Sequence, residues 1–321
     1  MAHMIDTTTG AAAMAYVGRT PWHGLGAQLQ PGASIEEWTA AARLGYTVLE
    51  SPVLYESPAS SELQRWPLRK VLHRSDTGAP LAVVSDGYRV VQPAEVMDFF
   101  RRLGELGGFE LETAGAMSDG RRVWALARVS AGADIVEGDT VRPYLLFGTS
   151  YDGTMATVAK FTDIRVVCNN TIVRALGEGG STVRVLHSER FDADEVRLQL
   201  GIVASSWERF LVQSRALAGV PMSKMEADEF VQELLRPYHT GRLELNETRG
   251  YKRIMDLFAN RKAIGSDIPG VAGTRWAMLN AVTQLVDHER GRSDSTRLES
   301  AWFGTGAAMK QRAVDLLAEG V

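Results

Sequence analysis

The sequence predicts an α+β fold, in which an antiparallel β-meander with one packed helix is followed by an all-α C-terminal part. Three Asp-Gly pairs lie in the first half, each between segments rich in Val, Leu, Phe, Tyr or Trp. Long helical periodicity begins after about residue 190 and continues to the end. We therefore expect a β-rich core over residues 5–190, with a helix at 93–107, and a helical part over residues 191–321.

The Asp-Gly pairs predict three β-hairpins, because Asp-Gly readily adopts the positive φ angles of tight hairpin turns. They are Asp86-Gly87, Asp119-Gly120 and Asp152-Gly153. In chain order they would join residues 81–85 to 88–92, 109–116 to 121–130, and 144–150 to 155–161. Consecutive hairpins give a largely antiparallel sheet.

One helix interrupts these hairpins. Pro93 occupies its first turn, apolar residues recur on one face as far as Leu106, and Gly107-Gly108 ends it. We expect this helix to pack across the sheet.

The segment from Phe161 to Arg174 combines two patterns. Alternating apolar residues up to Cys168 predict a strand, and Asn169-Asn170-Thr171 is typical of a cap that starts a short helix ending at Gly177. Residues 183–187 predict one more strand.

The second part reads as a series of helices separated by Pro or Gly, several of them preceded by capping residues. The expected helices are 193–218, 224–235, 247–263, 274–289 and 305–319. On the fourth of these, Trp276, Asn280, Thr283 and Asp287 share one face. Either they line a ligand pocket or the helix is buried with its polar groups satisfied.

Composition excludes several classes of protein. The 321 residues are 45% hydrophobic and 23% charged, which is enough for a packed globular core. No apolar run is long enough to span a bilayer, and residues 1–4 resemble a vector remnant rather than a secretion signal. We expect no membrane contact and a cytoplasmic location. With a net charge of −4, the protein does not have the bulk positive charge that coats duplex DNA.

The sequence offers no catalytic machinery. The single cysteine, Cys168, rules out an internal disulfide and a multi-cysteine metal site, and we interpret it as structural rather than as a nucleophile. The histidines lack metal-ligand spacing, and no phosphate-binding loop is present. We therefore expect neither enzymatic activity nor a cofactor.

Three segments are locally basic, and each is either a nucleic-acid contact or an ordinary solvated face. The first has Trp66 and the second Tyr251 beside its cations. Their basic residues are Arg65, Arg69, Lys70, His73 and Arg74; Arg249, Lys252, Arg253, Arg261 and Lys262; and Lys160, Arg165 and Arg174.

Five segments spread over the chain resemble the phage/plasmid-like proteins built on domain of unknown function 932. They are residues 19–26 (RTPWHGLG), 87–92 (GYRVVQ), 149–154 (TSYDGT), 165–171 (RVVCNNT), and 274–276 with 280–283 (TRW and NAVT). Tyr151 departs from the expected family pattern, which has His at this position, so no role of that His can be transferred.

A helix packed on an antiparallel meander, in a phage setting and without an ATPase, is also similar to single-strand annealing proteins such as Rad fifty-two, RecT and Erf. This resemblance implies a homo-oligomeric ring or filament that binds single-stranded DNA and anneals it without ATP in a bacterial cytoplasm. Trp66 would stack on bases or wedge between them. The residues expected to contact phosphates are Lys160, Arg165, Arg174, Arg69, Lys70 and Arg74.

Two alternatives stay open from the sequence. A protein-interaction module of a phage or plasmid, without nucleic-acid activity, fits the acidic net charge and the extended helical part. An enzyme with a Cys168 nucleophile would need a base to activate the thiol, and the sequence shows none paired with it.

Overall fold

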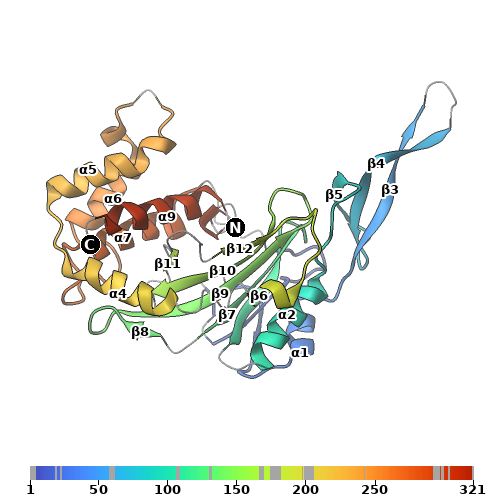
Figure 1. Cartoon of the computed structure of the whole chain (residues 1–321), viewed down its shortest axis with the longest axis horizontal. Helices are drawn as coiled ribbons and strands as arrows, with labels where there is room; N and C mark the ends of the chain where they lie inside the picture. Colours follow the sequence, from blue (N-terminus) through green and yellow to red (C-terminus); the bar gives the residue numbers. More distant parts are fainter. Residues whose placement is uncertain are drawn as a thin grey trace.

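The computed structural model confirms the predicted fold class: an antiparallel sheet with a packed helix precedes a group of helices (Figure 1). The structure describes residues 5–18, 20–21, 24–57, 62–105, 109–129, 132–165, 170–173, 182–196, 198, 206–241, 243–291, 297, 300–302 and 304–319. Of residues 163–165, 170–173, 182 and 206 it describes the backbone alone. Within these ranges, no helix has the length and apolar character needed to cross a membrane.

The main sheet is built around the second and third predicted hairpins. The strands run in the order β11-β10-β9-β7-β6-β1-β2, with β12 and β8 paired beside this path, and β1 and β2 are the one parallel pair among the described strands. Their bounds are β1 Met14–Val17, β2 Ala27–Leu29, β6 Glu110–Met117, β7 Arg122–Arg128, β8 Ala133–Asp134, β9 Thr140–Ser150, β10 Thr157–Arg165, β11 Asn170–Val173 and β12 Thr182–Val185.

The two faces of this sheet build different cores, as the alternation of strand residues requires. Leu145 and Phe147 of β9 pack with helices α1 (Ile35–Ala41) and α2 (Pro93–Glu105). Tyr144 and Leu146, which point the other way, form a smaller cluster with β1 and β7 residues. Helix α2 is the predicted helix over 93–107, and its apolar face lies on the sheet as expected.

The first predicted hairpin is wrong. Residues 88–92 form no strand, and β5 (Pro80–Ser85) pairs instead with the preceding strand β4 (Leu63–Arg74). The Gln92 side chain exchanges hydrogen bonds with both backbone groups of Val48, at 2.8 and 3.0 Å. Tyr88 packs in the main core, where its hydroxyl donates to the Ser150 carbonyl at 2.7 Å. These tertiary contacts hold residues 88–92 away from β5.

A second, three-stranded sheet projects from the body of the molecule (Figure 1). It consists of β3 (Val48–Glu56), β4 (Leu63–Arg74) and β5, and we call it the arm. Its base is buried, because Val48, Leu72 and Val84 belong to the main core. Further out, β3 and β4 pair with each other alone, since β5 reaches only as far as Arg69.

The segment after β10 also differs from its prediction. Asn170–Val173 is strand β11, antiparallel to β10, rather than the start of a helix. Cys168, the rest of the predicted Asn-Asn-Thr cap and its short helix up to Gly177 lie outside the described residues. Strand β12 matches the strand predicted over 183–187.

The helical part follows its sequence signals closely, because serine and threonine caps fix where helices begin. Ser223 forms a capping box with Glu226 at the start of α5, and Thr248 and Thr274 cap α6 and α7. The helices are α4 Ser206–Gly219, α5 Lys224–Leu235, α6 Arg249–Ala259, α7 Arg275–Gln284 with a π-helical turn at Leu285–Glu289, and α9 Thr305–Ala318; the short 3-10 turns are Arg236–Tyr238 and Leu245–Glu247.

Helix α7 lies at the centre of this part. Trp276 is fully buried, and its indole nitrogen donates to Asp139 of the β8–β9 turn at 2.8 Å, which ties the helices to the sheet. Asn280 and Thr283 are also buried, and both make hydrogen bonds within the helix. Trp276, Asn280 and Thr283 are therefore buried structure, whereas Asp287, in the π-helical turn that follows, lines a cleft.

Candidate functional site

Arg74, one of the predicted phosphate contacts, is buried instead. It is 1% exposed, and its guanidinium lies between Asp6 and Asp76 and 4.0 Å from the centroid of the Tyr46 ring. Burial acts to lower the pKa of Arg74, but hydrogen bonds to Asp76 and Asp6 outweigh it and raise the pKa, so the charge is retained. Arg74 holds the N-terminal segment to the arm and cannot reach a phosphate outside.

Lys160 is a second correction. It is 8% exposed, and its Nζ donates to the backbone carbonyl of Trp302, which belongs to the helical part. Burial, with the nearby cations Lys310 and Arg184, lowers the pKa of Lys160 to about 7. The alternation of β10 placed Lys160 on one face of the sheet, but the helical part covers that face.

Arg165 and Arg174 are not tested by the structure. Arg165 ends β10, where its backbone pairs with Val141 and Asn170, but its side chain is outside the described part. Arg174 lies outside the described residues entirely. Their contact with phosphate stays a prediction.

In the second basic segment, on and just after α6, two of the five cations form described ion pairs, and Arg249, Lys252 and Arg261 are exposed. Arg253 pairs with Glu289 at 2.6 Å and Asp256 at 3.0 Å, and Lys262 pairs with Asp256 at 2.7 Å. The Tyr251 hydroxyl donates a hydrogen bond to Asp228, so this edge of the ring is not free. We interpret the basic surface of this helix as an ordinary solvated face.

The arm carries the remaining predicted residues, Trp66, Arg69 and Lys70, and its pairing register assigns each to a face. Lys70 lies opposite Pro52 and forms an ion pair with Glu50 at 2.9 Å. These residues share the face whose base joins the core. Trp66 lies opposite Val53, and Arg69 opposite Ser85, so both point to the other side.

We call this other side the open face of the arm, because nothing in the described chain covers it. Two hydrogen bonds confirm the register: Tyr55 Oη to Gln64 Oε1 at 3.0 Å, and Ser51 Oγ with His73 Nε2 at 2.9 Å. By pairing and alternation, the open face consists of Leu49, Ser51, Val53, Tyr55, Gln64, Trp66, Arg69, Val71, His73, Val83 and Ser85.

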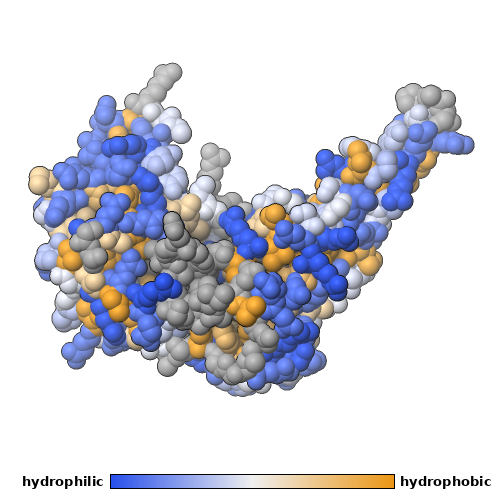
Figure 2. Space-filling view, in the orientation of Figure 1, coloured by the Kyte–Doolittle hydropathy of each residue, from blue (hydrophilic) through white to orange (hydrophobic). Residues whose placement is uncertain are grey.

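The open face is apolar and aromatic, with little charge. Tyr55 is 49% exposed, Trp66 44% and Val83 55%, and hydrophobic residues are visible along the arm in Figure 2. Among the described positions of its three strands, Arg69 is the one Asp, Glu, Lys or Arg on this face. Its guanidinium carbon lies 5.7 Å from the centroid of the Trp66 ring, within cation–π range.

A separate cleft of about 870 Å³ lies on the main sheet, bordered by the start of α1, the end of α2 and the helical part, and we call it the sheet cleft. Strands β6, β7 and β9 form its floor, and the segment after β1, the start of α1 and the helical part form its walls. Residues that line it include Val17, Pro21, Trp38, Phe109, Leu111, Leu126, His288 and Trp302.

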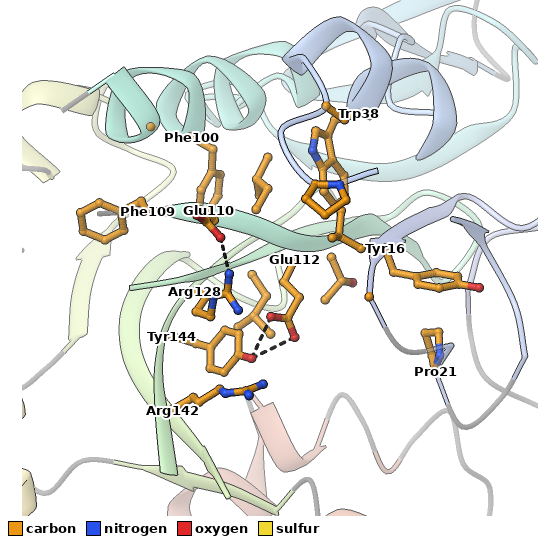
Figure 3. A pocket seen from close by; sticks show the side chains of 18 of the residues that line it. Tyr16, Pro21, Trp38, Phe100, Phe109, Glu110, Glu112, Arg128, Arg142 and Tyr144 are labelled. Atoms are coloured by element: carbon orange, nitrogen blue, oxygen red, sulfur yellow. Dashed lines mark hydrogen bonds and ion pairs between the residues drawn. The ribbon is translucent and has the colours of Figure 1, made fainter. Parts of the chain in front are cut away.

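The floor of the sheet cleft is polar (Figure 3). Arg128 pairs with Glu110, and the Tyr144 hydroxyl lies 2.9 Å from both oxygens of Glu112. Burial, and then the adjacent Glu112 charge, raises the pKa of Tyr144, so its phenol stays protonated. Arg142 extends beside them, and its buried Nε has no hydrogen-bond partner within the described chain. No motif in the sequence predicted this site, because its residues come from distant segments.

Two of the segments that carry the family resemblance meet in space. Tyr88 bonds to the Ser150 carbonyl, and its ring stacks on His187 with centroids 4.3 Å apart. Tyr151, next along the chain, is fully buried.

Comparison with known proteins supports the resemblance at the level of the family. Among curated proteins and among solved structures, no match to the chain is found. The model of one family, described as Domain of unknown function (DUF932), matches residues 80–302, which is more than half of the chain and includes β5, the main sheet from β6 onward and most of the helical part. The chain therefore belongs to the DUF932 family.

Proposed function

We propose that this protein binds single-stranded DNA on the open face of the arm and, as a homo-oligomeric ring or filament, anneals complementary strands without ATP. Its place would be recombination of phage or other mobile elements in the bacterial cytoplasm. The observation that carries the proposal is the exposed pair of Tyr55 and Trp66 on one face, with Arg69 beside the indole.

Base stacking and a nearby cation are what single-strand binding requires. Stacking on an aromatic side chain contributes about 1–3 kcal/mol per base and tolerates any sequence. Trp66 and Tyr55 lie on neighbouring strands two residues apart in register, so successive bases can stack on adjacent rings. Arg69 would then contact the phosphate between them. Arg165 and Arg174 stay in the proposed contact set, while Lys160 and Arg74 leave it.

The acidic net charge and the single arginine on this face predict how strongly DNA binding should depend on salt. Each phosphate that a protein neutralises on a single strand adds about 0.7 to the slope of log affinity against log salt. With Arg69, Arg165 and Arg174 as the proposed phosphate contacts, the slope should be at most about 2, and stacking should supply a large share of the affinity.

Fluorescence anisotropy with a labelled oligothymidylate tests binding. Trp66→Ala is expected to weaken binding about tenfold, since 1.4 kcal/mol corresponds to a factor of ten, and Trp66→Phe should restore most of it. Arg69→Gln should weaken binding and reduce the salt slope. Arg236→Gln, a change at an exposed arginine on the helical part, is the matched control. Absence of any salt-sensitive binding at low ionic strength would rule the proposal out.

Annealing and assembly need their own measurements. Mixing complementary strands, one labelled with a donor and one with an acceptor dye, should show faster pairing with the protein and no effect of added ATP. Light scattering and negative-stain images should show rings or filaments with bound oligonucleotide. A monomer that binds DNA but does not speed pairing would contradict the annealing role and leave the binding role.

The apolar character of the open face favours a second candidate, a module that binds another protein. Leu49, Val53 and Val83 add apolar surface around the two aromatic rings, and such patches on monomers often mark protein interfaces. In that case Trp66→Ala would abolish co-purification of a protein partner, and the oligonucleotide would show no binding to the unmodified protein.

A further inference from the structure

The sheet cleft lies on the main sheet rather than on the arm, and it contains groups that the proposed DNA-binding face does not use. Its volume of about 870 Å³ is within the range of small-molecule sites, which are commonly about 300–1,000 Å³. Distant parts of the chain enclose it. The floor comes from the sheet, one wall from the described residues after β1 and the start of α1, another from the end of α2, and a third from Asp287, His288, Ala301 and Trp302. A site assembled in this way is a defined concavity rather than a surface irregularity.

Most charged groups that line the cleft already have partners in the protein. Arg128 pairs with Glu110, Arg101 pairs with Asp98 at 2.6 Å and also with Glu105, and Asp287 pairs with Lys310 at 2.6 Å. These pairs leave no net charge to offer a ligand.

Two groups on the floor are not matched in this way. Arg142 makes no hydrogen bond or ion pair among the described residues, although its Nε is buried. Glu112 accepts hydrogen bonds from the neutral Tyr144 phenol and is in no described ion pair, while the charge of Arg128, which is itself paired with Glu110, acts on it from nearby. The Arg142 charge acts on the Tyr144 hydroxyl, so the two unmatched groups flank the same phenol. The Arg142 side chain is half-buried, so a bound anion can reach it, and a buried N–H group without a partner is costly.

The apolar wall completes the chemical description. Phe109 and Trp302 are half-buried and line the cleft, and Pro21 lies on the wall that faces the sheet. Figure 3 shows Phe109 and Pro21 on either side of the polar groups of the floor. A complementary ligand therefore has an anionic group, a planar ring and hydrogen-bond donors on the ring edge.

We propose that the sheet cleft binds a nucleoside monophosphate whose base carries an exocyclic amino group. The phosphate would pair with the Arg142 guanidinium, which presents two parallel N–H groups to phosphate oxygens. The amino group of the base would donate to Glu112, and the ring would pack against Trp302, which lies on the same face of the sheet as Tyr144. This inference is independent of DNA binding by the arm.

Isothermal titration with deoxyadenosine monophosphate, using the full chain, tests the assignment. Binding should weaken at least tenfold in Arg142→Gln and severalfold in Glu112→Gln, which keeps an acceptor for Tyr144 but loses the charge. Deoxyadenosine without its phosphate should bind at least tenfold more weakly to the unmodified protein. Arg236→Gln, an exposed arginine far along the chain, should leave binding unchanged.

A second variant and two competing ligands make the nucleotide-binding test decisive. Arg142→Lys retains a cation and should fold even if Arg142→Gln does not, and it should bind the nucleotide less tightly than the unmodified protein. Inorganic phosphate and L-tryptophan serve as competing probes. No nucleotide binding at millimolar concentration, equal affinity for inorganic phosphate, or tighter binding of L-tryptophan would each overturn the proposal, whatever the arm does with DNA.

Discussion

Two tyrosines near the β9–β10 turn have opposite hydrogen-bonding states. The Tyr88 hydroxyl donates to Ser150 at 2.7 Å, whereas the buried Tyr151 hydroxyl has no partner within the described chain. Burial raises the pKa of Tyr151 well above its ordinary value, so this hydroxyl stays neutral and desolvated. An unsatisfied buried hydroxyl costs about 1–3 kcal/mol, and a made hydrogen bond contributes about 1 kcal/mol.

Removing each hydroxyl should therefore have a different effect. We expect Tyr151→Phe to leave the free energy of unfolding unchanged or raise it by up to about 1 kcal/mol, and Tyr88→Phe to lower it by about 1 kcal/mol. Urea unfolding followed by far-ultraviolet circular dichroism measures both. Equal destabilisation by the two changes would show that Tyr151 has a partner.

Arg74 gives a second prediction at this scale. Arg74→Met removes the cation between Asp6 and Asp76 and leaves the Asp6 carboxylate buried without its partner. Breaking a buried ion pair in this way costs about 3–5 kcal/mol. The control is Arg101→Gln, whose ion pairs are on the surface and should contribute less than about 1 kcal/mol. Thermal unfolding of both variants compares them, and similar melting temperatures would contradict the structural role of Arg74.

At the scale of the element, the β6–β7 turn depends on a left-handed backbone. Ser118, Asp119 and Gly120 have φ angles of 55°, 59° and 84°. A Cβ atom on Gly120 would lie 2.6 Å from Arg74 Nη1, so the turn and the buried cation are packed against each other. Besides joining β6 to β7, the turn therefore packs against the buried Arg74 side chain.

Substitution at this turn should show both effects. Gly120→Ala adds a steric clash to the backbone strain of about 1–2 kcal/mol, whereas Gly138→Ala, with φ of 82° and open space around it, adds strain alone. We expect Gly120→Ala to be the more destabilising change by at least 1 kcal/mol, on the order of a small steric overlap in a packed site. Equal losses in chemical denaturation would mean that Arg74 moves aside freely.

For the whole molecule, Lys160 couples the sheet to the helical part. Its pKa is about 7 in the folded protein against 10.5 for an ordinary lysine, because burial disfavours the charge. Between these two values the unfolded chain holds a proton that the folded protein has released. The free energy of unfolding should therefore rise with pH over this interval, by up to about 1.4 kcal/mol per pH unit.

Lys160→Met should remove this contribution. We expect it to stabilise the protein at neutral pH and to flatten the increase in stability between pH 7.5 and 9.5. Chemical denaturation at several pH values measures the slope, and Lys70→Met, at a surface ion pair, is the control. An unchanged slope in Lys160→Met would mean that the lysine is charged in the folded protein.

Local chemistry determined much of the fold in advance. The hairpins at Asp119-Gly120 and Asp152-Gly153, helix α2 and the starts of α5 and α7 all follow from turn residues, caps and periodicity within a few positions. Asp86-Gly87 shows the limit of such signals, because contacts of Tyr88 and Gln92 with distant segments outweigh the hairpin preference.

The sequence also determined which residues are cationic and aromatic, and it singled out Trp66 and Arg69. Only the tertiary structure decided which of them are available to a ligand. In the sequence, Arg74 and Lys160 are cations in basic segments, as Arg69 is. In the structure, however, Arg74 is enclosed by Asp6 and Tyr46, and Lys160 is covered by the helical part. Burial is a property of segments far apart in the chain, as is the meeting of Arg142 and Glu112 in the sheet cleft. The spacing of residues along the sequence therefore predicts neither the burial of a side chain nor the proximity of Arg142 and Glu112.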